Sequence, residues 1–84
     1  MMKLYSIKDN KVGFWKPFVC HNDAVASREF GNMINFRGSS GDFFVQENYC
    51  DLDLYCLGTY DENTGVITPD VQFICSGVSL KKEV

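Results

Sequence analysis

The sequence predicts an α+β fold: a small, mainly antiparallel β-sheet of about four strands with one α-helix packed on one face, in the order ββαββ. Residues 50–60 alternate apolar and polar side chains, which is typical of a strand with one buried face. The sequence DENTG at 61–65 then supplies a turn with a glycine, so this strand is expected to return as a hairpin. Residues 23–36 carry an apolar stripe at helical spacing. With 84 residues the chain is expected to form a single domain, 1–84.

Two strands are expected before the helix. Residues 3–9 (KLYSIKD) are rich in β-forming residues and predict the first strand. Residues 10–13 (NKVG) predict a turn, and residues 14–22 (FWKPFVCHN) predict the second strand. Pro17 has no backbone N–H, so we expect it at the start of that strand or on an edge of the sheet.

The helix is expected to begin at Asn22 or Asp23, both good N-cap residues, and to end near Phe36. Its core-facing stripe is predicted to consist of Ala26, Phe30, Met33 and Ile34. The glycine- and serine-rich sequence RGSSGD predicts a flexible loop near 37–42.

The second half of the chain is expected to form a hairpin. Residues 43–50 are predicted to be irregular or briefly extended, and residues 52–60 to form a strand. By alternation, Cys50, Leu54 and Cys56 point to the core and Asp53 to solvent. The return strand, residues 66–80, is expected to break or bend at 68–70, and the tail near 80–84 to fray.

The composition favours an acidic globular protein. The net charge is −3, and most basic residues lie before residue 40 whereas most acidic residues lie after it. This asymmetry is compatible with a polyanionic partner, but the overall acidity argues against strong non-specific phosphate binding. Neither a secretory signal nor a membrane-spanning stretch is evident. The four cysteines are therefore expected to be free thiols in a reducing compartment.

Catalytic and metal chemistry is not indicated. Cys20 and His21 are adjacent, so on a strand they would point to opposite faces and could not act together. The cysteines lack the spacing of a zinc site. Asp51 and Asp53 are best explained as a solvated strand face. We therefore expect no enzyme activity, no metal and no cofactor.

One segment has the composition of a nucleic-acid-binding site. Residues 8–18 interleave lysines, which can follow phosphates, with aromatic rings, which can stack on unpaired bases. The alternative is that these rings pack beneath the helix. The candidate residues for binding single-stranded DNA are Lys3, Lys8, Lys11, Phe14, Trp15 and Lys16. The candidate residues for a protein partner, on the sheet face left uncovered by one helix, are Tyr5, Tyr55 and Leu57.

Three segments, in this order, resemble a known family: MKLYSIKD at 2–9, HNDAVASREF at 21–30 and YCDLDLYCLGTYDENTG at 49–65. They resemble the small nonstructural protein of gokushovirus-type microviruses, the Microviridae phages with single-stranded DNA genomes. The resemblance covers residues 2–66. The loop that follows the helix departs from the family, which commonly has proline and histidine there.

The resemblance implies a non-enzymatic accessory protein that acts in genome replication or packaging in the host cytoplasm. Two modes of action remain open at this point. The first is weak binding of single-stranded DNA. The second is an adaptor role, as a homodimer or docked on phage capsid or replication proteins, through an open sheet face or an edge strand.

Overall fold

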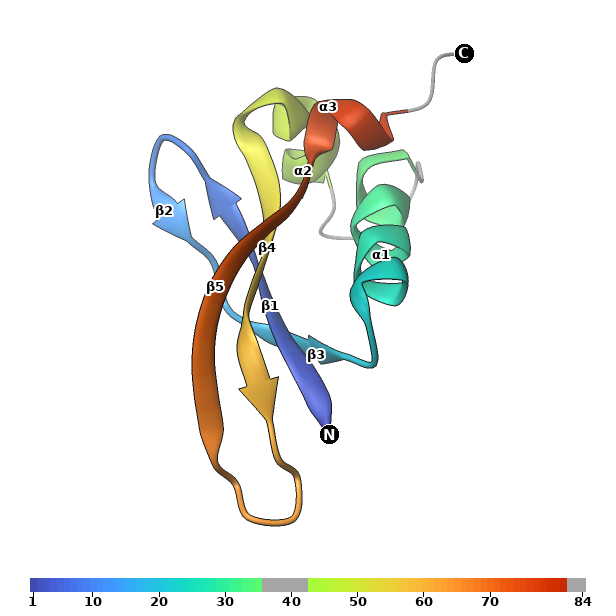
Figure 1. The fold of residues 1–84 in the computed structure, drawn as a ribbon. Helices are drawn as coiled ribbons and strands as arrows, with labels where there is room; N and C mark the ends of the chain where they lie inside the picture. Colours follow the sequence, from blue (N-terminus) through green and yellow to red (C-terminus); the bar gives the residue numbers. More distant parts are fainter. Residues whose placement is uncertain (36–42, 82–84) are drawn as a thin grey trace.

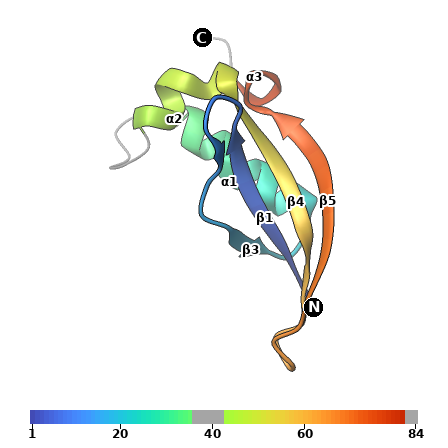
Figure 2. The same cartoon turned by 90° about the vertical axis from the view of Figure 1, so that its left-hand side faces the viewer.

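A computed structural model of the chain describes residues 1–35 and 43–81. One antiparallel sheet has the strand order β2-β1-β4-β5, and β3 pairs with β1 on the same edge as β2 (Figure 1). The strands are β1 (Met2–Asp9), β2 (Gly13–Phe14), β3 (Phe18–Cys20), β4 (Leu52–Tyr60) and β5 (Ile67–Ser76). The longest helix, α1 (Asp23–Asn35), lies behind the sheet when the opposite face is viewed (Figure 2). The predicted α+β class with a mainly antiparallel sheet is confirmed.

The strand predicted at 14–22 is in fact two short strands, so the sheet has five strands where about four were expected. The chain leaves the ladder between β2 and β3, around Pro17, which cannot donate a backbone hydrogen bond. Trp15 N still donates to Ile7 O at 2.8 Å before the break. Pro17 thus lies outside both strands, immediately before β3, which pairs with β1 alone and so lies on an edge of the sheet.

Two further segments are helical where none was predicted. Residues 43–50, expected to be irregular or extended, form α2 (Phe43–Asn48) and enter the 3-10 turn η1 (Tyr49–Asp51). Cys50 therefore precedes the strand and is exposed, so its predicted core position is wrong. The end of the predicted return strand becomes α3 (Gly77–Leu80), whose first turn is capped by Ser76 Oγ accepting from Ser79 N at 3.2 Å.

The helix α1 begins as expected. Asn22 is its N-cap, because Asn22 Oδ1 accepts a hydrogen bond from Val25 N at 2.9 Å. Ala26, Phe30 and Ile34 of the predicted stripe are buried, while Met33 is only half-buried. The end expected near Phe36, the loop expected at 37–42 and residues 82–84 of the expected tail lie outside the described residues.

The predicted hairpin forms between β4 and β5. Gly65 N donates to Asp61 O at 2.7 Å, and Gly65 has a φ of 77°, in the region that favours glycine. Leu54 and Cys56 are buried as predicted. Asp53, predicted to be exposed, is half-buried and accepts a hydrogen bond from Asn10 Nδ2 at 2.9 Å.

The strand β5 continues through Pro69 with irregular pairing. Its register against β4 shifts twice, between Leu54 and Tyr55 and between Cys56 and Gly58. Gly58 pairs with Pro69 and has a φ of 147°; a Cβ there would collide with the Thr68 carbonyl oxygen. The expected irregularity near residue 69 is therefore a local change of register that Gly58 accommodates.

The core lies between α1 and one face of the sheet. It contains Tyr5, Ile7, Cys20, Ala26, Phe30, Ile34, Val45, Leu52, Leu54 and Cys56. The opposite face of the sheet is not covered by any of the described helices (Figures 1 and 2). This leaves β1 and β4 with one packed face and one open face, whereas residues 67–73 of β5 are all exposed.

Candidate functional site

Three aromatic rings form a line across the open face of the sheet, and we call Phe14, Tyr55 and Phe73 the aromatic row. The ring centroids of Phe14 and Tyr55 are 5.3 Å apart, and those of Tyr55 and Phe73 are 5.6 Å apart. Both contacts are edge-to-face, with interplanar angles of 80°. Phe14 is 48% exposed and Phe73 is 55% exposed, so the two ends of the aromatic row are open to solvent.

Strand pairing explains why these rings meet. Tyr55 on β4 is paired with Phe73 on β5 and with Ser6 on β1. Ser6 is small and buried, and its Oγ donates to Trp15 O at 2.8 Å, so no ring stands between Phe14 and Tyr55. The short strand β2 then places Phe14 beside Lys8, its partner on β1.

Lys8 places a positive charge over the aromatic row. Its Nζ lies 5.6 Å from the centroid of the Phe14 ring and 5.7 Å from that of the Tyr55 ring, within the range of cation–π attraction. Asp53 is the residue opposite Lys8 on β4. The nearby carboxylate reduces the positive potential at this end of the face.

The other predicted binding lysines lie elsewhere. Lys3 Nζ is 3.4 Å from Asp23 Oδ1, on the face that carries α1. Lys11 Nζ is 3.6 Å from Asp51 Oδ2. The structure therefore does not gather the lysines onto one phosphate-binding surface.

Tyr5 does not lie on the open face, and this expectation is wrong. It is fully buried beneath α1, its ring stacks on Phe18 at a centroid distance of 6.0 Å, and its hydroxyl donates to Asp23 Oδ1 at 2.6 Å. Burial, together with this hydrogen bond, raises the pKa of Tyr5 far above its usual value. The same hydrogen bond lowers the pKa of Asp23. Tyr5 is thus a buried anchor for the start of α1.

Leu57 is half-buried and lies where the sheet is irregular. The β1–β4 register shifts between Leu4 and Tyr5, which leaves Leu57 without a paired residue on β1. Tyr55 is the one predicted partner-binding residue that joins the aromatic row. Phe73 was missed because the two register shifts in β5 obscure the alternation by which a strand is read from sequence.

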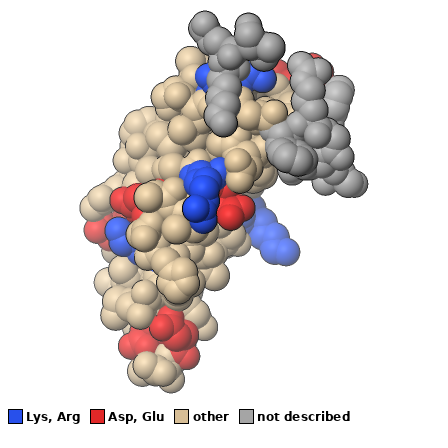
Figure 3. Space-filling view, turned by 90° about the vertical axis from the view of Figure 1, so that its right-hand side faces the viewer, with Lys and Arg blue, Asp and Glu red and all other residues tan. Residues whose placement is uncertain are grey.

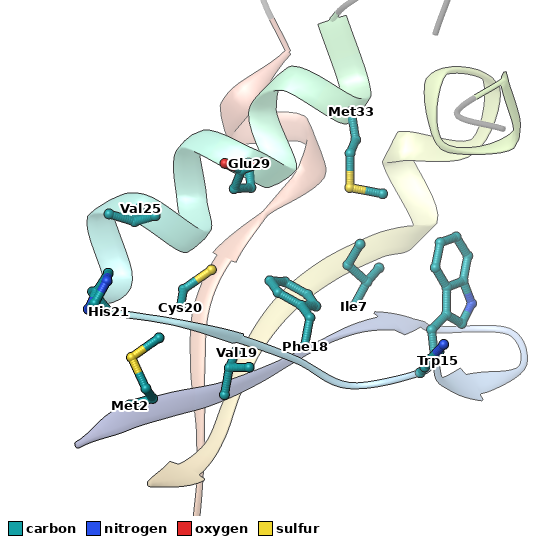
Figure 4. A pocket seen from close by; sticks show the side chains of 11 residues that line it. Met2, Ile7, Trp15, Phe18, Val19, Cys20, His21, Val25, Glu29 and Met33 are labelled. Carbon is teal, nitrogen blue, oxygen red and sulfur yellow. The ribbon is translucent and has the colours of Figure 1, made fainter. Parts of the chain in front are cut away.

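Trp15 and Lys16 line a groove between α1 and β3, on the other side of the sheet (Figure 4). The groove has a volume of about 610 Å³ and is walled by Val25 and Met33 of α1 and by Phe18 of β3. Trp15 packs against the core. This agrees with the alternative that the rings of residues 8–18 pack beneath the helix instead of stacking on bases.

Cys20 lies on the floor of this groove and is 8% exposed. Burial, and secondarily the carboxylate of Glu29, raises the pKa of the Cys20 thiol. Burial therefore disfavours the thiolate of Cys20, which is the form of a cysteine that reacts.

The charged side chains on the α1 side are scattered. Figure 3 shows small groups of charged atoms on this side, some with basic and acidic atoms next to each other, with uncharged surface between the groups and acidic atoms near the tip of the hairpin. Asp61 and Glu62 lie in that tip. Within residues 1–35 and 43–81, no cluster of three or more His, Cys, Asp or Glu side chains could hold a metal ion. In the same part of the chain, no helix combines the length and the apolar character needed to cross a membrane.

Comparison with known proteins gives one result. The family described as Phage ORF5 protein matches residues 2–80, almost the whole chain. The comparisons with curated proteins and with solved structures gave no match. Because the match spans nearly the entire sequence, the chain belongs to the Phage ORF5 protein family.

Proposed function

We propose that this phage accessory protein binds single-stranded DNA weakly through the open face of its sheet. The proposal rests on the aromatic row, because exposed rings on a sheet face are suited to stacking on unpaired bases. Phe14 and Phe73 are the exposed stacking platforms, and their centroids are at most about 11 Å apart. Lys8 supplies the phosphate contact.

The chemistry of this face favours a single strand over a duplex. Bases in a duplex are already stacked on one another and present only their edges in the grooves. One lysine opposite one aspartate gives little electrostatic attraction, so the affinity depends on stacking. A binder of this kind fits a role in replication or packaging of a single-stranded DNA genome in the host cytoplasm. We place the protein with the gokushovirus-type microviruses and assign it no catalytic activity.

The test is a titration of labelled oligothymidylate, at low and at high salt, with a duplex of equal length as control. Phe14→Ala and Phe73→Ala should each lower the affinity by about 1–3 kcal/mol. Lys8→Gln should lower the salt slope by about 0.7. Val12→Ala is the matched control, since Val12 is 84% exposed in the turn before β2 and does not belong to the aromatic row. If the wild-type protein does not bind at low salt, DNA binding by the isolated protein is refuted.

A second candidate is an adaptor role, as a homodimer or as a partner of phage capsid or replication proteins. It is favoured by the aliphatic side chains of β5, since Ile67 is 53% exposed and Val71 is 60% exposed, and neither can stack on a base. The solution mass separates the homodimer from the monomer. Loss of a dimer in Val71→Asp, with DNA binding absent in the wild type, would favour the adaptor.

A further inference from the structure

The helix α1 has a second stripe beside the buried one, and its two apolar residues, Val25 and Met33, pack against the core and also line a groove. Val25, Glu29 and Met33 are spaced four residues apart and all line the groove between α1 and β3 (Figure 4). Each lies one position before a core residue of α1, so this stripe runs alongside the buried one. Val25 and Met33 are half-buried, although Ala26, Phe30 and Ile34 are almost completely buried.

The dimensions of the groove fit a short helix. From Val25 to Met33 the wall extends over about 12 Å, at about 1.5 Å per residue. This is about two helical turns, enough for apolar side chains at positions i, i+4 and i+7 of a partner. The opposite wall and floor carry Trp15, Phe18 and Met2, and methionine and aromatic side chains adapt well to such apolar anchors.

The negative charge of Glu29, at the centre of the stripe, favours a partner with a basic side chain. Glu29 is exposed, lies between two apolar residues and forms no ion pair with the residues that the structure describes. A second copy of α1 packed on the stripe would bring two Glu29 carboxylates together, and a phosphate backbone would also be repelled. Lys16 lines the groove as well, but its long side chain is exposed and can keep its ammonium group in water.

We propose that the groove between α1 and β3 docks an amphipathic helix of a different protein, with an apolar stripe about two turns long and a lysine or arginine that pairs with Glu29. The site is separate from the aromatic row, which lies on the other face of the sheet. The proposal therefore does not depend on DNA binding. It gives the protein a docking site for a helix that carries an apolar stripe and a basic residue.

The probe is a synthetic helical peptide with a leucine stripe flanked by lysines. A peptide with glutamates in place of the lysines tests the charge, and a scrambled peptide of the first composition tests the stripe. Trp15 is the only tryptophan of the chain and lines the groove, so its fluorescence reports occupancy directly. The leucine–lysine peptide should change this fluorescence saturably, and the scrambled peptide should not.

Two variants test the residues. Glu29→Lys should weaken binding of the leucine–lysine peptide by about tenfold and make the glutamate peptide the better ligand. Glu47→Lys is the control, with the same change of charge at an exposed site on α2 outside the groove. Met33→Asp should abolish binding while the circular dichroism spectrum stays native. Equal binding of the lysine and glutamate peptides, no fluorescence change with the leucine–lysine peptide, or an equal effect of Glu47→Lys would overturn the proposal.

Discussion

The substitution Tyr5→Phe isolates one buried hydrogen bond that fixes the start of α1 to the sheet. Tyr5 is fully buried and its ring stacks on Phe18, so phenylalanine keeps the packing and removes only the hydroxyl. The lost bond runs from Tyr5 Oη to Asp23 Oδ1 at 2.6 Å. Hydrogen bonds to charged groups contribute about 1.5–3 kcal/mol to stability. Because the Asp23 side chain is 48% exposed and water can replace the phenol, we expect a loss of about 1–2 kcal/mol at neutral pH.

The pH dependence of the stability loss in Tyr5→Phe is a sharper test than the size of that loss at one pH. The hydrogen bond lowers the pKa of Asp23 in the folded state, so this contribution is fully present above the unfolded value of about 4 and is lost as the pH falls through the lower folded value. The raised pKa of Tyr5 acts at the other end of the scale. Its contribution is present below the unfolded value of about 10 and is lost as the pH rises above it. The difference between wild type and Tyr5→Phe should therefore be largest between about pH 4 and pH 10.

Urea unfolding followed by circular dichroism, at several pH values, measures this difference. Tyr60→Phe is the control, because the hydroxyl of Tyr60 has no hydrogen-bond partner among the described residues. It should leave the free energy of unfolding nearly unchanged at every pH. A Tyr5→Phe variant as stable as wild type at pH 7, or a loss that is the same at pH 7 and pH 3, would refute the reasoning.

Three further predictions concern the rest of the fold. Asn22→Ala should lower the free energy of unfolding by about 1 kcal/mol, since it removes the N-cap of α1, and an unchanged urea midpoint would contradict the cap. Gly58→Ala should cost about 1–3 kcal/mol or more, because a Cβ at a φ of 147° meets the Thr68 carbonyl oxygen; a variant of wild-type stability would show that the strand pairing is different. All four cysteines should be alkylated when the protein is taken directly from cells and unfolded without reductant, and mass spectrometry detecting a disulfide-linked population would contradict the expectation of a reducing compartment.

The sequence by itself was sufficient to predict those elements of the fold that depend on residues close together in the chain. The alternation in residues 52–56 correctly placed Leu54 and Cys56 in the core, because successive side chains of a strand point to opposite faces. The stripe of α1 and its cap at Asn22 were equally predictable, since both are set by residues within a few positions of each other. The turn at 61–65 needed only its own glycine and polar residues.

Only the tertiary structure decided which side chains share a surface. The lysines and rings of residues 8–18 are adjacent in sequence, but Lys8 and Phe14 lie on the open face whereas Trp15 lines the groove on the other side. The aromatic row joins Phe14, Tyr55 and Phe73 from three separate strands, and the register that brings them together depends on irregular pairing along β4 and β5. The burial of Tyr5 also depends on tertiary packing. The helix α1 covers one face of β1, and the sequence of the strand alone does not specify which face a distant helix will cover.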